Sequence, residues 1–140
     1  MADIENPVEV LTPDAALELM GTQQLGRLVV RLTNDFDLYP VNFVVSEGKI
    51  YLRSAEGSKL FTVALNEQVL FEADEHENDQ AWSVIVKGHA RILDRNEDIQ
   101  KADTLPLKPW IPTLKYNYVE ITPDTVSGRR FQLGAEPERY

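Results

Sequence analysis

Two cations and two hydroxyl groups surround a glycine between residues 53 and 59, and this combination is typical of a phosphate pocket. The residues are Arg53, Ser54, Gly57, Ser58 and Lys59. A helix that begins near Ser58 would present unpaired backbone N–H groups and the positive end of its dipole, and both favour an anion. Arg53 can donate paired hydrogen bonds to phosphate oxygens, and Lys59 adds a compact positive charge. The alternative is an ordinary loop whose serine caps a helix.

Other residue types exclude several kinds of chemistry. The sequence has no cysteine, so it has no thiolate nucleophile, disulfide or cysteine-ligated metal site. His76 lies in the acidic tract 74–77, but adjacent side chains on an exposed tract diverge, and a solvated loop explains this tract better than a metal site. We therefore expect no bound metal. The glycine patterns of dinucleotide-binding and nucleoside-triphosphate-binding folds do not occur.

Length and charge set the class of protein. The chain has 140 residues, 43% of them hydrophobic, which predicts one domain, residues 1–140, with a packed core. The formal net charge of -9 argues against nucleic acid as a partner, because binding a phosphate backbone needs a basic face. Residues 1–6 lack the apolar stretch of a signal peptide, and no apolar run is long enough to cross a membrane. We expect a soluble, cytoplasmic protein with no membrane partner.

The phosphate-pocket residues lie among segments rich in β-branched and aromatic residues, which predict seven strands. The predicted strands are residues 27–33, 38–45, 49–53, 69–73, 82–93, 116–121 and 129–133. Turn residues separate the first three, so they should form an antiparallel meander. Pro123-Asp124 and Ser127-Gly128 should join the last two. Gly88, inside the longest strand, should mark a bulge or a close approach of two backbones.

Short helices and loops complete the prediction. Thr12, Pro13 and Asp14 start a helix that ends at Gly21. Further helices are predicted at 59–65 and 96–103, and loops at 74–80 and 106–112. Six or seven strands are more than one open sheet needs. We therefore predict a mainly β fold, a six- to seven-stranded antiparallel split or closed β-barrel with two or three short peripheral helices.

Three segments share an order and spacing that point to a known family. They are Gly26-Arg27-Leu28 followed by 39–45, then 52–60, and then 82–90. Together they resemble the pyridoxamine 5'-phosphate oxidase-like family of flavin-binding split barrels. The similarity covers residues 11–93 well, with a weaker match at Trp110 and at 127–130. The resemblance implies a homodimer of split barrels with flavin mononucleotide (FMN) bound in two clefts at the subunit interface.

The resemblance also implies roles for particular residues, while it identifies no catalytic residue. Arg53, Ser54 and Lys59 would hold the phosphate, with Ser58 at the start of the adjoining helix. Val41, Asn42 and Phe43 would run along the isoalloxazine ring, Trp82 and Ser83 would lie near the flavin, and Trp110 would come from the second subunit. The flavin carries the redox chemistry itself, so the protein needs only to bind the phosphate, orient the ring and control access to the flavin.

The C-terminal residues 116–140 lack the basic and aromatic set of the pyridoxamine 5'-phosphate oxidases proper, so the chain looks more like the small flavin-reductase or nitroreductase-like branch. We expect an FMN-dependent oxidoreductase that transfers hydride or electrons between a reduced nicotinamide and a small organic acceptor. The alternatives are a reductase that uses a deazaflavin coenzyme, a protein that stores or carries flavin without turnover, and a purely structural β-barrel.

Overall fold

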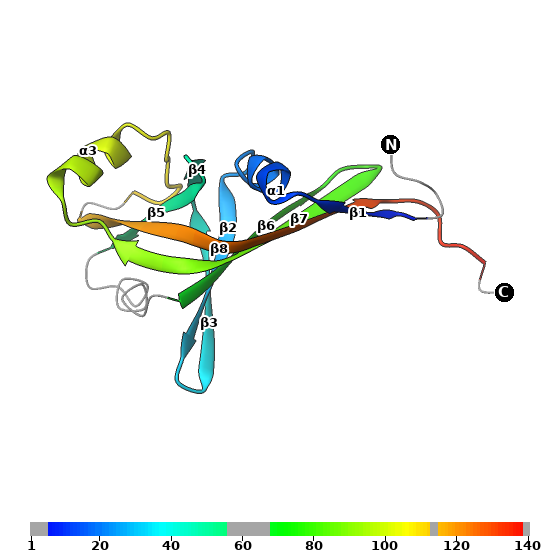
Figure 1. Ribbon diagram of the computed structural model, residues 1–140, viewed down its shortest axis with the longest axis horizontal. Helices are drawn as coiled ribbons and strands as arrows, with labels where there is room; N and C mark the ends of the chain where they lie inside the picture. The colour runs from blue at the N-terminus through cyan, green and yellow to red at the C-terminus, as the bar shows by residue number, and fades with distance from the viewer. Residues whose placement is uncertain (1–5, 56–67, 113–114, 139–140) are drawn as a thin grey trace.

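The computed structural model describes residues 6–55, 68–112 and 115–138. This part of the chain forms an eight-stranded sheet in which every pairing is antiparallel, together with two helices (Figure 1). In chain order the elements are β1 (Val8–Leu11), α1 (Pro13–Met20), β2 (Leu25–Leu32), β3 (Asp35–Asn42), β4 (Val44–Ser46), β5 (Lys49–Ala55), β6 (Gln68–His76), β7 (Gln80–Ile92), α3 (Asn96–Asp103) and β8 (Tyr116–Gln132). The predicted mainly β split-barrel fold with short peripheral helices is confirmed.

The sheet curls because of the way its two ends are connected. The strand order is β3-β2-β6-β7-β8-β5-β4, and β1 pairs with β8. Phe43 alone separates β3 from β4 in sequence, so the two ends of this order must lie close together. Both antiparallel pairings of the predicted meander are present, but the expected middle strand 38–45 is not continuous. It divides at Phe43, so that β3 pairs with β2 while β4 pairs with β5. The Phe43 side chain is buried in the core, and its N–H donates to the Gln24 carbonyl.

β8 is one strand of 17 residues, where the sequence predicted two strands and a connection. It pairs with β7 along most of its length, and on its other edge with β5 and then β1. The pairing register shifts between Lys87 and Gly88, opposite Pro123. A Cβ on Gly88 would lie only 2.3 Å from the Thr122 carbonyl oxygen. The bulge and the close approach predicted at Gly88 are both confirmed, and Pro123 is tolerated within β8 at this irregularity.

The predicted loop 74–80 is mostly strand. Asp74 pairs with Ser83 and His76 pairs with Ala81, so β6 and β7 continue almost to the tip of their hairpin. Their polar side chains are exposed at that tip, and the backbone ladder forms regardless of side-chain polarity.

Both described helices were predicted at their observed positions. Thr12 caps α1, because its hydroxyl oxygen accepts a hydrogen bond from the Ala15 N–H at 3.2 Å. Ala16 and Met20 of α1 are fully buried against the sheet. Neither α1 nor α3 has the length and apolar character that a membrane crossing requires. The predicted helix 59–65 lies outside the described residues.

Two cores lie on opposite faces of the sheet. The main core fills the inside of the curl, and its largest fully buried side chains are Phe43, Phe71, Met20, Leu28, Ile50, Leu52 and Ile121. The smaller core lies between α3 and the outer face of β5, β7 and β8, and consists of Tyr51, Leu93, Ala102, Leu107 and Tyr118. Side chains alternate along β5, so Ile50 and Leu52 enter the main core while Tyr51 contacts the smaller one.

Candidate functional site

Arg53 of β5 lies against two tyrosines of β8. Its guanidinium carbon is 4.1 Å from the centre of the Tyr116 ring and 5.8 Å from the centre of the Tyr118 ring. The Arg53 Nε is buried and has no hydrogen-bond partner among the described residues. A buried donor on a charged group is costly unless it is paired, so this position is suited to an anionic ligand.

The structure does not bring the predicted phosphate-binding side chains to one face. Arg53 and Ser54 are neighbours on a strand, so their side chains lie on opposite faces of the sheet. Ser54 is buried, whereas Arg53 is half-exposed beside the tyrosines. Ser58 and Lys59 lie outside the described residues.

Residues 41–43, which were expected to follow the flavin ring, form the bend between β3 and β4. Phe43 is 1% exposed and makes an edge contact with Phe71, with ring centres 4.9 Å apart, so its side chain belongs to the core. Val41 is half-buried and packs against the same core. Asn42 donates to the Gln24 carbonyl at 3.0 Å.

Trp110 meets this bend through its backbone. Its N–H donates to the Asn42 side-chain oxygen at 2.9 Å, while its side chain is 62% exposed. A hollow of about 250 Å³ lies beside Asn42 and is lined by residues 21–24 and 42–44 with Pro106 and Lys108. The structure thus brings Asn42 and Trp110 together next to a space that a ligand could enter.

Trp82 and Ser83 of β7 have different surroundings. Trp82 is buried in the main core, so its side chain packs the fold. Ser83 is half-buried and lies between Asp74 of β6 and Arg129 of β8 in the sheet. The described members of the predicted flavin set therefore have different surroundings in one chain. Arg53 lies beside the tyrosines, Ser54 is on the opposite face of the sheet, residues 41–43 form the bend near Trp110, Trp82 is in the main core and Ser83 lies on β7.

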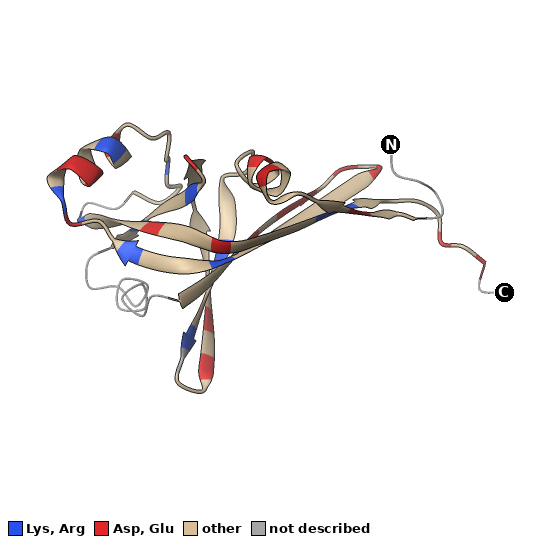
Figure 2. Cartoon of the chain, viewed as in Figure 1, with Lys and Arg blue, Asp and Glu red and all other residues tan. Residues whose placement is uncertain are grey.

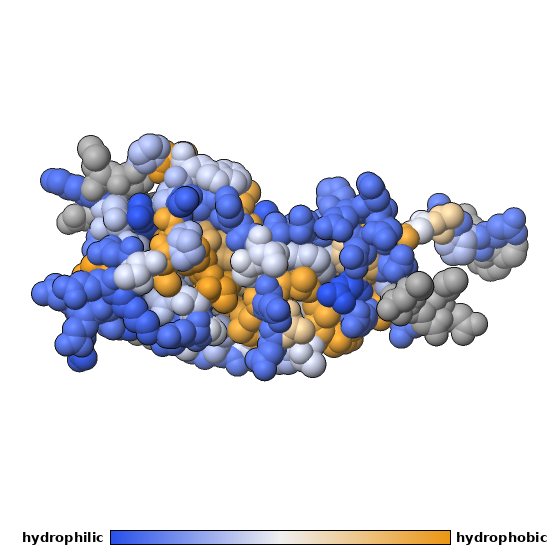
Figure 3. Space-filling model, turned by 90° about the horizontal axis from the view of Figure 1, so that it is seen from above, coloured by the Kyte–Doolittle hydropathy of each residue, from blue (hydrophilic) through white to orange (hydrophobic). Residues whose placement is uncertain are grey.

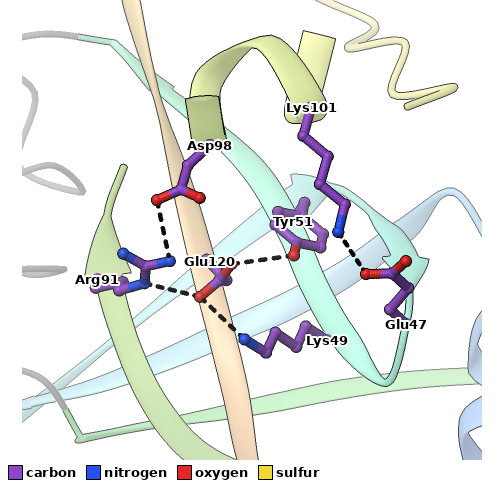
Figure 4. Close-up of polar contacts among 7 residues, drawn as sticks. All are labelled: Glu47, Lys49, Tyr51, Arg91, Asp98, Lys101 and Glu120. Atoms are coloured by element: carbon purple, nitrogen blue, oxygen red, sulfur yellow. Dashed lines mark hydrogen bonds and ion pairs between the residues drawn. The ribbon is translucent and has the colours of Figure 1, made fainter. Parts of the chain in front are cut away.

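A buried carboxylate lies in a polar network that the sequence did not reveal. Glu120 of β8 is 5% exposed, and its oxygens accept hydrogen bonds from the Tyr51 hydroxyl at 3.0 Å and the Arg91 Nε at 2.8 Å (Figure 4). The Lys49 Nζ is 3.6 Å from the same carboxylate. These side chains line a small cavity of about 130 Å³ under α3.

Two residues of α3 extend the network. Asp98 lies 3.6 Å from the Arg91 guanidinium, and the Lys101 ammonium lies 2.6 Å from the Glu47 carboxylate in the turn after β4. The network therefore ties α3 to the β4–β5 turn and to β7 and β8. Strand alternation places Glu120 on the face opposite Val119 and Ile121, and its pairing with Arg91 is visible only once β7 lies beside β8.

The pKa values in this network follow from burial and pairing. Burial alone would raise the pKa of Glu120, but hydrogen bonds from Arg91 and Tyr51 and the nearby positive charges lower the pKa below its usual value. Burial and the hydrogen bond to Glu120 raise the pKa of Tyr51 to about 12. At neutral pH the carboxylate is ionised and the phenol is protonated. Because the charges are paired with one another, we assign this cluster a structural role.

Charges elsewhere are mixed. In the view of Figure 2, lysine and arginine lie on strands and on α3 among the acidic residues. Within the described residues, no group of three or more histidine, aspartate or glutamate side chains is placed to hold a metal ion.

Comparisons with known proteins agree with this fold. The family model for pyridoxamine 5'-phosphate oxidase matches residues 12–130. The crystal structure of a proposed pyridoxamine 5'-phosphate oxidase from Corynebacterium glutamicum is 53% identical, with a TM-score of 0.88 and coverage of 96% of this chain and 100% of that one. The FAD binding protein from Mycobacterium smegmatis is 40% identical, with a TM-score of 0.82 and coverage of 90% and 100%. Rv3129 of Mycobacterium tuberculosis is 41% identical over 90 residues, which are 64% of this chain and 82% of that protein.

The match covers most of the sequence, and the solved relatives have the same curled antiparallel sheet. The resemblance inferred from the three sequence segments is confirmed. The chain belongs to the pyridoxamine 5'-phosphate oxidase family.

Proposed function

We propose that this protein is a flavin-dependent oxidoreductase that transfers hydride or electrons between a reduced nicotinamide and a small organic acceptor. The single observation that carries the proposal is Arg53, a half-exposed cation with a buried Nε that has no partner among the described residues. A flavin phosphate would supply oxygen acceptors for the half-exposed guanidinium. Membership of the family, and the 40% identity to a protein that binds FAD, favour flavin over other phosphorylated ligands.

The sequence pointed to FMN, whereas the M. smegmatis relative is described as binding FAD. Both coenzymes contain the isoalloxazine ring, the ribityl chain and the first phosphate, so Arg53 could contact either one. The flavin would supply the redox chemistry. The chain would hold the phosphate with Arg53 and orient the ring with the bend at residues 41–43.

We further infer a homodimer in which each flavin site uses both subunits. The outer face of β3 exposes Phe36 and Leu38, which are 67% and 56% exposed. Phe36 borders a hollow of about 490 Å³ whose lining includes Val29 and Leu70 of the adjoining strands. A large apolar hollow is unusual on a monomer and suits a second copy of the chain.

The charged margin of this hollow fits a twofold contact. Arg31, Lys87 and Asp124 line the same hollow, so two copies related by a twofold axis could pair unlike charges. Apolar side chains also reach the surface in the middle of the molecule on the face seen in Figure 3. A second subunit would bring further side chains to the separate parts of the predicted flavin set.

The first experiment asks which coenzyme binds. Mass spectrometry of the small molecule that co-purifies should identify FMN or FAD, and the purified protein should show the absorption of oxidised flavin. In titrations of the apoprotein, Arg53→Ala should weaken flavin binding by about 10- to 100-fold, because a charge-assisted hydrogen bond is worth ~1.5–3 kcal/mol. Arg95→Ala, which removes an exposed arginine at the start of α3, is the matched control and should leave affinity unchanged.

Turnover separates an enzyme from a flavin carrier. Steady-state oxidation of NADH or NADPH with an acceptor should exceed the rate with free flavin. If flavin binds without such turnover, the protein is a carrier. If the apoprotein is stabilised only by a deazaflavin coenzyme, that alternative replaces the flavin proposal.

Light scattering coupled to size-exclusion chromatography tests the dimer. The wild-type protein should have twice the mass of one chain, and Phe36→Glu should yield a folded monomer. Val10→Ser, which changes an exposed apolar residue on β1, should leave the mass unchanged. A monomeric wild type would contradict the proposed assembly.

A further inference from the structure

We propose that Tyr116 is a positioning residue that holds the Arg53 guanidinium ready for a phosphate group, and that Asp103 of α3 braces this arrangement through Tyr118. The inference rests on the proposed flavin-binding function and deepens it, because it names the residues that shape the anion site. The sequence patterns did not single out Tyr116, Tyr118 or Asp103.

The pairing of β5 with β8 places the Tyr116 ring against the Arg53 guanidinium. Tyr118 pairs directly with Arg53, and Tyr116 pairs with Ala55, so both tyrosines lie on the face of the sheet that carries Arg53. The distance of 4.1 Å from the guanidinium carbon to the Tyr116 ring centre is within the range of a cation–π contact. Such a contact restricts a side chain that would otherwise adopt many rotamers.

The Tyr118 ring holds the Tyr116 ring in place. Tyr116 and Tyr118 meet edge to face, with ring centres 5.5 Å apart and an interplanar angle of 83°. The Tyr118 hydroxyl donates to the Asp103 carboxylate at 2.6 Å. Burial and this hydrogen bond raise the pKa of Tyr118, so the phenol remains a donor at neutral pH. Asp103 is the last residue of α3, and the helix therefore contacts the arginine through two rings.

This arrangement suits an oxygen-rich ligand. A ring face attracts the guanidinium charge but accepts none of the in-plane hydrogen bonds that phosphate oxygens accept from arginine. The Nε is buried and lacks a partner among the described residues, while the side chain as a whole is half-exposed, so a ligand would meet the exposed part of the guanidinium. Tyr116 would fix the plane of the Arg53 guanidinium and leave the edge of that group for the ligand.

The test compares FMN with riboflavin, which has the same ring and ribityl chain but no phosphate. Dissociation constants are measured for the full-length apoprotein and for Tyr116→Leu, Tyr116→Phe, Arg53→Ala and the Tyr116→Leu/Arg53→Ala double variant. Tyr116→Leu should weaken FMN binding by about 3- to 10-fold. Tyr116→Phe keeps the ring face and should stay within about twofold of wild type. Riboflavin affinity should change in neither variant.

The double variant identifies the route of the effect. If Tyr116 acts through Arg53, Tyr116→Leu should have no further effect on FMN affinity once Arg53 is alanine. Independent losses that add, or an equal loss of riboflavin affinity, would show that Tyr116 only packs the fold and would overturn the inference.

Asp103 provides a second test that does not disturb the aromatic contact. It is exposed at the end of α3, so Asp103→Ala should fold, and it should weaken FMN binding by about 2- to 5-fold. Asp103→Asn keeps a hydrogen-bond acceptor and should restore most of that affinity. Wild-type binding of flavin with unchanged affinity in the Tyr116 and Asp103 variants refutes the positioning role alone. A wild type that binds neither FMN nor riboflavin refutes the proposed function and this inference together.

Discussion

Replacing Glu120 by glutamine should lower the free energy of unfolding at pH 7 by about 2–3 kcal/mol. Glutamine has nearly the same shape and can still accept a hydrogen bond from the Tyr51 hydroxyl. It cannot balance the charges of Arg91 and Lys49, whose nitrogen atoms lie 2.8 Å and 3.6 Å from the carboxylate. The variant therefore isolates the charge of a carboxylate that is 5% exposed.

The magnitude follows from the exposure of the partners. Removing one member of a fully buried ion pair costs ~3–5 kcal/mol. The Arg91 side chain is 49% exposed and the Lys49 side chain 39% exposed, so water can solvate both after the change. The charge-assisted hydrogen bond from Arg91 contributes ~1.5–3 kcal/mol, and the longer Lys49 pair contributes less than about 1 kcal/mol.

Urea denaturation followed by tryptophan fluorescence measures this difference, with the slope m unchanged if unfolding remains two-state. The pH dependence has a definite sign. Folding lowers the pKa of Glu120, so its contribution is complete above the unfolded pKa of about 4.5 and is lost as pH falls through the lower folded value. The gap between wild type and variant should therefore close on acidification below about pH 4.5.

Glu47→Gln is the matched control, because the Glu47 and Lys101 side chains are both exposed and an ion pair in water contributes little. Its denaturation midpoint should equal that of wild type. If Glu120→Gln is as stable as wild type, or if its deficit persists unchanged at acid pH, the charge of Glu120 does not stabilise the fold and the reasoning above is wrong.

Two further substitutions test the packing that supports the site. Gly128→Ala should lower the free energy of unfolding by ~1–3 kcal/mol in urea denaturation, because the new Cβ would lie 2.7 Å from the Ala16 Cβ and push α1 off β8. Gly134→Ala is the control and should have no effect, because no atom lies within 4 Å of its new Cβ. Phe43→Ala should cost ~3–5 kcal/mol by removing a fully buried ring, and a loss of flavin affinity without this destabilisation would contradict its place in the core.

Local sequence signals predicted those parts of the fold that depend on local chemistry. Thr12 and Pro13 defined the start of α1, and runs of β-branched residues located the strands. The errors occurred where a long-range partner overrides a local signal. Gly128 looked like part of a turn, but its hydrogen leaves room for α1 against a continuous β8. Pro123 looked like a chain reversal, but it lies opposite the bulge at Gly88.

In the candidate site, too, local sequence signals were visible and features that depend on strand pairing were not. An arginine beside hydroxyl groups is visible in the sequence, and this pattern singled out Arg53, whose binding role stays a prediction. The resemblance could not show that Ser54 lies on the opposite face or that Phe43 is a core residue, since both facts depend on which strand pairs with which. Tyr116 and Glu120 became noticeable only when α3 and β5 were placed beside β8.

α3 links the stability of the fold to the shape of the candidate site. A helix of eight residues is too short to be stable alone in water, so it depends on its contacts with the sheet. Lys101 and Asp98 tie its middle to the Glu120 network, and Asp103 ties its last turn to Tyr118 beside Arg53. These two sets of contacts can be separated by experiment. Glu120→Gln should reduce stability with little change in flavin affinity as long as α3 stays docked. Asp103→Ala should reduce flavin affinity and also lower stability by about 1–3 kcal/mol, because it leaves the buried Tyr118 hydroxyl without its acceptor.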